Sequence, residues 1–363
     1  MTKKNVFICI CTFMLVCVES HAKPVVYLWD YASLVAVQQQ PKSTAYRDMV
    51  RQADWVLRHE VLTVTQKEHA LSGDKHNYES LATYYWPNPA NPSGPYVPRD
   101  GEQNPDTEKY DFPRLLALAR DCAALGKAFF LTGNDVYYDR LCRQLDAWFI
   151  DEATRMNPHF AFSQFVPGLN DNRGTPGGVL DAYRLMDVLE SIQLTDNTRS
   201  LGRKRMRALK RWFSDLATWM VESENGRQAA LFGNNHAIAY HGTLLGIYLF
   251  TGKGRGQRTA IKDFGQLVVE QINEDGRMPN ELKRNNALTY SVFNLSHILD
   301  VCIMAHTAGL KVPEEVSRRI DASCRYLSTF IGHRERFPYK EIGNWEAEER
   351  NLKRELQRKE RLR

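Results

Sequence analysis

The sequence predicts an all-α fold, an (α/α) toroid in which helical hairpins form an incomplete ring. Apolar residues recur at helical spacing over most of the chain. The two-residue alternation of half-buried strands is almost absent. Predicted helices also end repeatedly in Thr-Gly, as at Thr132-Gly133 and Thr251-Gly252. Each glycine fits a helix C-terminal cap, and the repetition favours paired helices.

The apolar periodicity locates the individual helices. The segment that starts at Phe112 has Asp111 as a candidate N-cap and a proline in its first turn. The expected helices span residues 46–62, 112–131, 136–150, 179–191, 201–223, 235–250, 259–272, 287–308 and 313–330.

Two long aperiodic stretches interrupt the helices, at residues 72–113 and 157–178. The centre of the first, Tyr84–Tyr96, is too rich in proline for an element interior. Loops of this length in a compact domain are usually functional lids or disordered linkers. The aromatic side chains favour a packed lid.

The N-terminus has the pattern of a secretory signal peptide. Lys3 and Lys4 precede an apolar run over residues 6–18, and Ser20-His21-Ala22 resembles a cleavage site. We expect cleavage after Ala22 and a periplasmic or secreted protein. The alternative, a lipid anchor at Cys17, lacks the small residue expected before the cysteine. No later apolar run looks long enough to span a membrane.

The rest of the chain reads as one domain, over residues 23–340, followed by a charged tail at 341–363. The tail predicts a solvated helix without a core of its own. Removal of residues 1–22 lowers the formal net charge from +5 to +4. This mild basicity suits an acidic ligand. We expect no nucleic-acid partner, and nothing indicates an oligomeric state.

The four cysteines beyond the signal lie in apolar helical contexts without metal-ligand spacing: Cys122, Cys142, Cys302 and Cys324. We expect buried free thiols. Disulfides between neighbouring helices are the alternative in an oxidising compartment. We expect no catalytic metal and no cofactor.

The first candidate site is Gly233-Asn234-Asn235-His236, at the start of a predicted helix. Side-chain amides and free backbone N–H groups at a helix N-terminus favour an anion. Tyr240 lies one turn further on the same face. A helix cap beside a packed histidine is the plain alternative. Only one asparagine is needed as a cap, so the second is available for function.

A second candidate site combines Arg284 and Tyr290. Six residues separate them, so they would not share a face of one continuous helix. A turn at Asn285-Asn286 would let them converge. Glu281 is placed to hold Arg284 by a bidentate ion pair. Taken alone, these residues are a surface arginine and a half-buried tyrosine.

Together the two candidate sites fit β-elimination at a uronic acid. Proton abstraction at C5 requires neutralisation of the adjacent carboxylate by amide, imidazole or guanidinium groups. It also requires a base at C5 and an acid at O4. One tyrosine can serve both steps when H5 and O4 lie on the same side, as in mannuronate and glucuronate. Arg284 is the candidate for lowering the pKa of Tyr290.

Motifs in a consistent order cover nearly the whole mature chain, and their set resembles the alginate lyase superfamily of helical-toroid polysaccharide lyases. They are Tyr85-Trp86-Pro87-Asn88-Pro89, Arg99-Asp100-Gly101, Thr132-Gly133-Asn134-Asp135, Met156-Asn157-Pro158-His159, Gln164 with Pro167-Gly168, Gly233-Asn234-Asn235-His236, Asp275-Gly276, and Glu281-Leu282-x-Arg284 with Leu288-x-Tyr290-Ser291.

The resemblance implies a toroid catalytic domain over residues 23–340 with a cleft or tunnel and a lid around Tyr84–Tyr96. It assigns Asn235, His236 and Arg284 to the substrate carboxylate and implies Tyr290 as base and acid. The candidate substrate-binding residues are Tyr85, Trp86, Arg99, Gln164, Tyr240 and Glu281.

The chain departs from the family pattern in two places. Ala239 stands where many members carry tryptophan, and the interval from Arg284 to Tyr290 is one residue shorter than in the best-known bacterial alginate lyases. The interval agrees better with a divergent branch that cleaves mannuronate-containing alginate or glucuronan.

Two other functions remain open from the sequence. Helical toroids also host inverting glycoside hydrolases, which need two opposed carboxylates, and Asp171, Asp181 and Glu281 are candidates. The third reading is a non-catalytic glycan-binding protein of the same fold.

Overall fold

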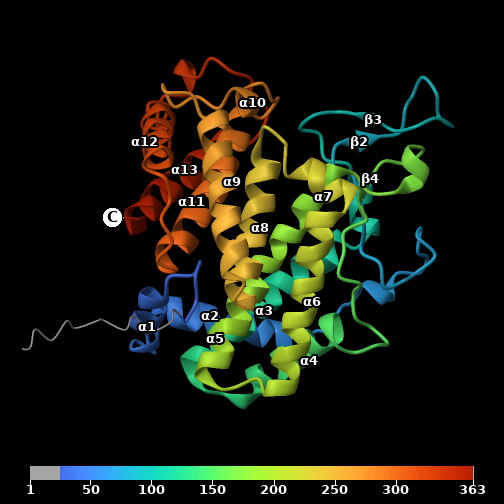
Figure 1. Cartoon of the computed structure of the whole chain (residues 1–363), viewed down its shortest axis with the longest axis vertical. Helices are drawn as coiled ribbons and strands as arrows, with labels where there is room; N and C mark the ends of the chain where they lie inside the picture. The colour runs from blue at the N-terminus through green and yellow to red at the C-terminus, as the bar shows by residue number, and fades with distance from the viewer. Residues whose placement is uncertain (1–24, 363) are drawn as a thin grey trace, which may run out of the picture.

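The computed structural model describes residues 25–362 and consists mainly of α-helices packed as antiparallel hairpins (Figure 1). The predicted signal peptide lies outside the described residues. The helices are α1 (Tyr31–Gln38), α2 (Thr44–Leu57), α3 (Phe112–Thr132), α4 (Asp135–Phe149), α5 (Met186–Thr198), α6 (Arg203–Glu222), α7 (Glu224–Ala229), α8 (Asn235–Thr251), α9 (Gly254–Gln271), α10 (Pro279–Leu282), α11 (Ala287–Thr307), α12 (Glu314–Ser328) and α13 (Trp345–Lys359). The predicted all-α toroid is confirmed.

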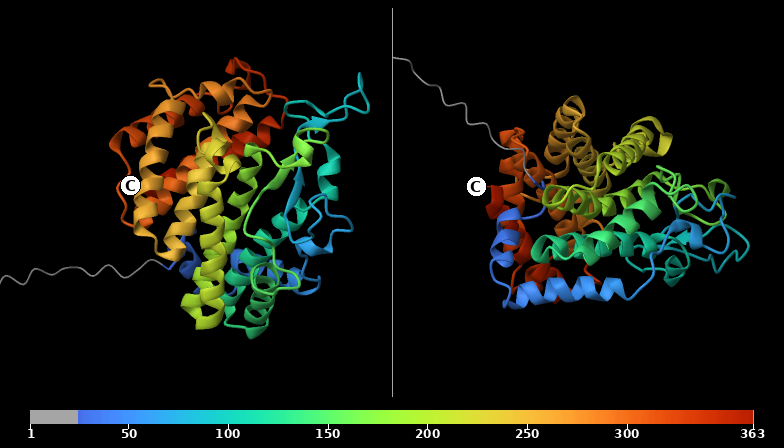
Figure 2. Two further views of the ribbon diagram at one scale, coloured as in Figure 1. Left: turned by 45° about the vertical axis from the view of Figure 1, so that its right-hand side comes forward. Right: turned by 90° about the horizontal axis from the view of Figure 1, so that it is seen from below.

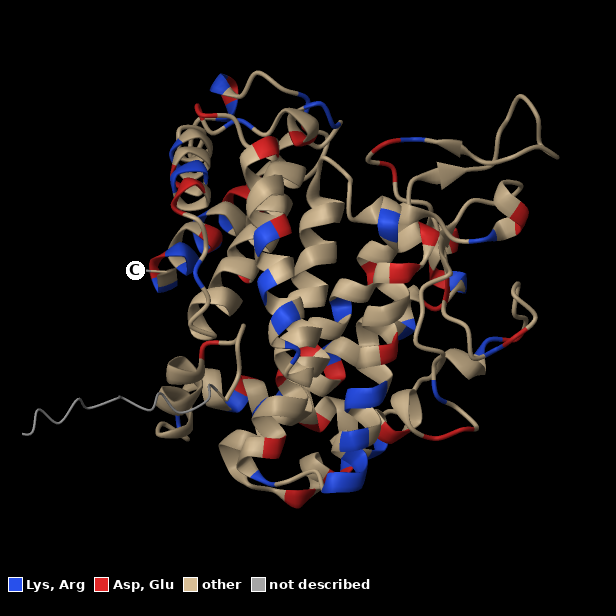
Figure 3. Ribbon diagram, viewed as in Figure 1, with Lys and Arg blue, Asp and Glu red and all other residues tan. Residues whose placement is uncertain are grey.

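Helix α8 forms the centre of the molecule. It carries no Lys, Arg, Asp or Glu, and most of its residues are buried (Figure 3). It packs against α9 on one side and α11 on another, while α3 packs against α5 (Figures 1 and 2). Gly133 and Gly252 end α3 and α8 in the left-handed conformation, with φ of 65° and 76°. The Thr-Gly helix ends are therefore C-caps, as predicted.

The two long irregular stretches meet in space through short strands. Strand β1 (Glu79–Leu81) pairs in parallel with β4 (Phe162–Phe165). Strands β2 (Tyr85–Trp86) and β3 (Val97–Pro98) form an antiparallel hairpin that projects from the helices (Figure 1). The loops predicted separately from the sequence thus build one rim of the molecule.

Asp111 precedes α3 as predicted, but its carboxylate does not cap the helix. It accepts a hydrogen bond from the backbone N–H of Glu79 at 3.0 Å and pairs with Lys67 at 2.6 Å. Separation of a buried carboxylate from its ammonium partner is strongly destabilising, because it leaves an unpaired charge in the interior. It anchors the rim to the start of α3.

Several helix boundaries differ from the prediction. Residues 179–191 were expected to form one helix, yet the 3-10 helix η4 (Pro176–Leu185) precedes α5. Helix α9 begins at Gly254, although two glycines in its first turns hide the helical pattern. The second one, Gly256, is required by packing: a Cβ atom there would lie 2.7 Å from the Tyr248 ring. Helix α1 was not among the helices predicted from the sequence.

The segment 341–363 was expected to be a solvated helix. The helix is confirmed, but its expected solvation is wrong. Helix α13 packs against α11, and Trp345 and Leu352 are buried in the main core. Arg358 pairs with Asp300 of α11, whose carboxylate also accepts the Tyr183 hydroxyl. The charged residues of α13 masked its apolar stripe.

Helix α11 is long and apolar enough to cross a membrane by length and composition, which the sequence reading did not anticipate. However, 78% of its most apolar window is buried inside the molecule. Among the described residues it is the one helix that meets this criterion. It is a core helix.

The buried stripe of α13 yields the first prediction. Leu352→Ala should lower the free energy of unfolding by about 3 kcal/mol, because it removes buried methyl groups and leaves a cavity. Urea unfolding followed by circular dichroism measures the change.

Arg350→Ala on the exposed face of α13 is the matched control, and it should change stability by less than about 0.5 kcal/mol. Equal effects of the two substitutions would mean that α13 does not belong to the core.

Candidate active site

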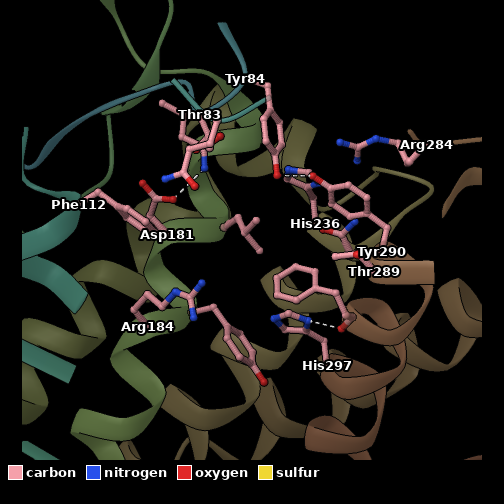
Figure 4. A pocket seen from close by; sticks show the side chains of 16 residues that line it. Thr83, Tyr84, Phe112, Asp181, Arg184, His236, Arg284, Thr289, Tyr290 and His297 are labelled. Atoms are coloured by element: carbon pink, nitrogen blue, oxygen red, sulfur yellow. Dashed lines mark hydrogen bonds between the residues drawn. The ribbon is translucent and has the colours of Figure 1, made fainter. Parts of the chain in front are cut away.

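The predicted catalytic residues line one cavity of about 340 Å³, which lies where η4, α8 and α11 meet the loop that carries Tyr84 (Figure 4). Asn235 and His236 come from the start of α8. Tyr290 belongs to the first turn of α11, and Arg284 precedes that helix. The turn between Arg284 and Tyr290 therefore brings them together, as the sequence reading required.

Tyr290 points into the cavity and donates its hydroxyl hydrogen to the Tyr84 hydroxyl at 2.7 Å (Figure 4). Burial and this hydrogen bond raise the pKa of Tyr290 above its usual value. The Arg284 guanidinium carbon lies 3.6 Å from the ring centroid, so the charge stacks on the ring face. The positive charge of Arg284 lowers the pKa of Tyr290, but burial raises it by more. The expected lowering of the Tyr290 pKa is thus absent in the free protein.

Arg284 is held by Asp100, and not by Glu281 as predicted. The Arg284 Nε atom donates to Asp100 Oδ1 at 2.9 Å, and the backbone N–H of Asn285 donates to Oδ2 at 2.9 Å. Although burial opposes it, these hydrogen bonds hold the pKa of Asp100 below its usual range. The loop after β3 is therefore tied to the candidate catalytic residues.

Glu281 instead lies beneath the cavity and fixes Asn235. Its carboxylate accepts the backbone N–H of Asn235 at 2.8 Å, and Asn235 Nδ2 lies 3.1 Å from each carboxylate oxygen. Glu281 is 1% exposed and burial raises its pKa. Asn235 Oδ1 has no hydrogen-bond partner within residues 25–362. Glu281 thus has a positioning role, outside the cavity surface.

Asn234 is the N-cap of α8, and it also orients His236. Its Oδ1 accepts the backbone N–H of His236 at 3.2 Å and lies 3.1 Å from His236 Nδ1. Nδ1 is therefore protonated in the neutral ring, and Nε2 lies near Gly177 with no hydrogen bond to the described part of the chain. Burial, aided by the Arg284 charge, lowers the pKa of His236 to about 4. The imidazole is neutral at pH 7.

Gln164, a predicted substrate-binding residue, lines the cavity. Its backbone adopts a positive φ of 47°, a costly conformation for a side chain of this size. Its Nε2 atom donates to Asp181 at 2.8 Å, and the other Asp181 oxygen accepts the hydroxyls of Tyr78 and Ser80. Asp181 thereby holds Gln164 against the cavity.

The remaining predicted substrate-binding residues are placed differently. Tyr85 lines a neighbouring pocket of about 310 Å³, which shares Tyr84, Gln164 and His236 with the main cavity. Trp86 and Arg99 contact each other in the β2–β3 hairpin, with the guanidinium 5.1 Å from the indole centroid. Neither Trp86 nor Arg99 lines the main cavity or this neighbouring pocket.

The structure contradicts the prediction that Tyr240 is a substrate-binding residue of the cavity. Its hydroxyl donates to the Met220 carbonyl at 3.0 Å, and its ring lines a separate groove beside α9. Although Tyr240 follows His236 by one turn, packing against α6 directs it away from the cavity. Helical spacing alone could not reveal this.

The carboxylates proposed for a hydrolase do not form an opposed pair. Asp171 is exposed on a loop, Glu281 is bound to Asn235, and Asp181 is saturated by hydrogen bonds. Within the described residues, no group of three or more His, Cys, Asp or Glu is arranged to hold a metal ion. The four cysteines are free and buried, as expected.

Three residues that shape the site were not among the predicted site residues: Tyr84, Asp100 and His297. The sequence also suggests Arg184 as a contact for carboxylates along the cleft, with a solvated arginine as the alternative, and this side chain lines the cavity. Tyr84 adjoins the predicted Tyr85, and Asp100 belongs to a motif quoted above. Their partners, however, are 206 and 184 residues away in the sequence. No local pattern signals such pairings.

The chain resembles known proteins in both sequence and fold. A family model described as "Alginate lyase" matches residues 62–337. The structure resembles that of an alginate lyase from Bacteroides ovatus, with a TM-score of 0.86, 31% identity and coverage of 92% of this chain and 91% of that one.

More distant matches share the fold alone. Alginate lyase A1-III from Sphingomonas species A1 has a TM-score of 0.52 at 15% identity, with coverage of 86% of this chain and 79% of that one. A variant of alginate lyase A1-III complexed with tetrasaccharide has a TM-score of 0.53 at 16% identity, with coverage of 87% and 80%. No curated protein sequence matches the chain significantly.

The buried histidine at the cavity wall yields a prediction on acid stability. Burial lowers the pKa of His297 to about 4, below the unfolded value of about 6.5. Its neutral form is therefore favoured by folding, so the stabilisation is complete above pH 6.5 and is lost as the pH falls through 4. Between pH 7 and pH 4, the wild type should lose about 3 kcal/mol more than His297→Gln.

Urea unfolding of both proteins across this pH range measures the difference. His69→Gln serves as the control because the His69 side chain is 88% exposed, and its acid sensitivity should match the wild type. Identical pH profiles for wild type and His297→Gln would contradict the assignment.

Proposed function

The chain belongs to the alginate lyase family, and on this basis we propose that it cleaves a uronic-acid polymer, mannuronate-containing alginate or glucuronan, by β-elimination. Family and fold make it a polysaccharide lyase. The observation that carries the finer proposal is the convergence of Tyr290, Arg284 and His236 on one cavity. A tyrosine, a guanidinium and an imidazole supply the groups that uronate elimination requires.

Carboxylate neutralisation is the first task of these residues. Arg284 supplies permanent charge beside Tyr290. A bound carboxylate would raise the pKa of His236 from its low resting value and favour the imidazolium form. The Asn235 amide nitrogen carries two hydrogens, and the Glu281 oxygens can share one. To donate the second hydrogen to the substrate carboxylate, the buried Asn235 amide would have to release one of these two contacts.

Proton transfer is the task of Tyr290. In the reactive form, the Tyr290 phenolate takes H5, and the electrons left at C5 spread into the neutralised carboxyl group. They then form the C4–C5 double bond while the C4–O4 bond breaks. The same tyrosine returns the proton to O4. Tyr84, within hydrogen-bond distance, can donate to the phenolate, and Arg284 stabilises its charge.

The N-terminal pattern supports action outside the cytoplasm. The signal peptide proposed for residues 1–22 would deliver the enzyme to the periplasm or the medium. Extended anionic polysaccharides would be encountered there.

A substrate panel tests this function. Purified protein is incubated with polymannuronate, glucuronan and a neutral glycan, while ultraviolet absorbance and reducing ends are recorded. We expect absorbance from the new double bond with at least one polyuronate and none with the neutral glycan. Reducing ends without absorbance would indicate hydrolysis. Binding without either signal would indicate a non-catalytic glycan-binding protein.

Tyr290→Phe tests the mechanism. It removes the group that moves the proton, so kcat should fall by about 100-fold or more while the fold is retained. Initial rates from ultraviolet absorbance measure kcat. Thermal unfolding measures whether the fold is retained.

Tyr248→Phe is a suitable control, since this half-buried α8 tyrosine lies outside the cavity and should retain full activity. Full lyase activity in Tyr290→Phe would refute the tyrosine mechanism even if the reaction class were right.

A further inference from the structure

Arg184 is a cationic side chain that the mechanism does not use. It lies at the end of η4, and its exposed guanidinium lines the same cavity as the catalytic residues (Figure 4). Its nearest ring is Phe112, 5.9 Å from the guanidinium carbon. Across residues 25–362, no carboxylate lies within salt-bridge distance of it and no hydrogen bond to it is formed. Its donors are therefore free.

The other basic side chains around the cavity are paired or neutral. Arg284 is paired with Asp100, so that pair carries little net charge. His236 and His297 are both neutral at pH 7, because burial lowers the pKa of each to about 4. Arg184 is consequently the cation of the cavity lining that has no ion-pair partner among residues 25–362, although the buried Asp181 carboxylate interacts with it electrostatically over a longer distance.

Asp181 would be the natural partner of Arg184, since both belong to η4 and face the cavity. Its two oxygens are instead occupied by Gln164, Tyr78 and Ser80. These hydrogen bonds hold the Asp181 carboxylate outside ion-pair distance of Arg184. An arginine left in this state can receive the carboxylate of a ligand by a bidentate pair.

The position of Arg184 suits a sugar that adjoins the reactive one. In Figure 4, Arg184 and His297 lie at the end of the cavity away from Tyr84, while Arg284 lies on the opposite wall. A polyuronate carries a carboxylate on each sugar. When one carboxylate is held by Arg284 and His236, the sugar that extends along the cavity brings another toward Arg184.

We propose that Arg184 forms a second carboxylate-binding subsite, which selects substrates with a uronate next to the uronate that undergoes elimination. This inference rests on the proposed function. It makes the enzyme specific for contiguous uronates, because a neutral neighbouring sugar would leave Arg184 without a partner.

Steady-state kinetics with Arg184→Gln tests the subsite. On the preferred polyuronate, KM should rise about 10-fold or more, as expected for loss of a charge-assisted contact, while kcat stays within about 3-fold. Arg184→Lys should recover part of the lost affinity, since it restores charge but not bidentate geometry. Arg207→Gln, an exposed arginine on α6, is the matched control.

Binding in an inactive background separates this inference from the lyase proposal. Calorimetry compares Tyr290→Phe with Tyr290→Phe/Arg184→Gln, using uronate oligosaccharides and reduced oligosaccharides whose adjoining carboxyl group is an alcohol. Arg184→Gln should weaken binding of the uronate oligosaccharide about 10-fold or more and leave binding of the reduced one unchanged.

Equal affinity of both backgrounds for the uronate oligosaccharide would overturn the subsite. Absence of cleavage by the wild type, with the binding difference retained, would overturn the lyase proposal and keep the subsite. Thermal unfolding of each variant excludes a folding defect as the cause.

Discussion

The ion pair between Arg284 and Asp100 is the constraint on which the site depends. It joins the loop after β3 to the turn before α11, two segments separated by 184 residues. The same guanidinium lies over the Tyr290 ring. Loop position and the electrostatic environment of the proposed base are therefore set by one interaction. Loss of the pair would leave the half-buried guanidinium and the backbone N–H of Asn285 unpaired together.

Buried carboxylates organise the polar side chains around this pair. Glu281 fixes Asn235 at the start of α8, and Asp181 fixes Gln164 in its left-handed conformation. Burial raises the pKa of both acids, and hydrogen bonds oppose that rise. Neither acid is needed as a proton donor in the proposed reaction. In the proposed mechanism their role is preorganisation, which would spare the enzyme the reorganisation of amides during catalysis.

The sequence predicted the helical fold well because helix periodicity and glycine caps are local properties. It predicted that Asn235, His236, Arg284 and Tyr290 would converge, and the structure brings them together. It failed where long-range packing decides. Tyr240 has the correct helical spacing but turns toward Met220.

The carboxylate that pairs with Arg284 was equally hard to predict. Glu281 and Asp100 are both carboxylates near Arg284, yet only folding reveals that Asp100 is the partner. Many charged residues surround the apolar stripe of the C-terminal segment. The sequence therefore predicts a solvated helix where α13 packs against the core. Its Trp345 and Leu352 contribute to the core that supports the cavity.

The position of α13 affects when the enzyme can become active. Arg358 holds Asp300, which holds Tyr183, and the Tyr183 ring packs on His297 at the cavity wall with centroids 4.3 Å apart. Arg361 also donates to the backbone carbonyls of Leu28 and Trp29, which joins the two ends of the described chain. Contacts of α13 therefore support this wall, and they can form only after that helix has been synthesised.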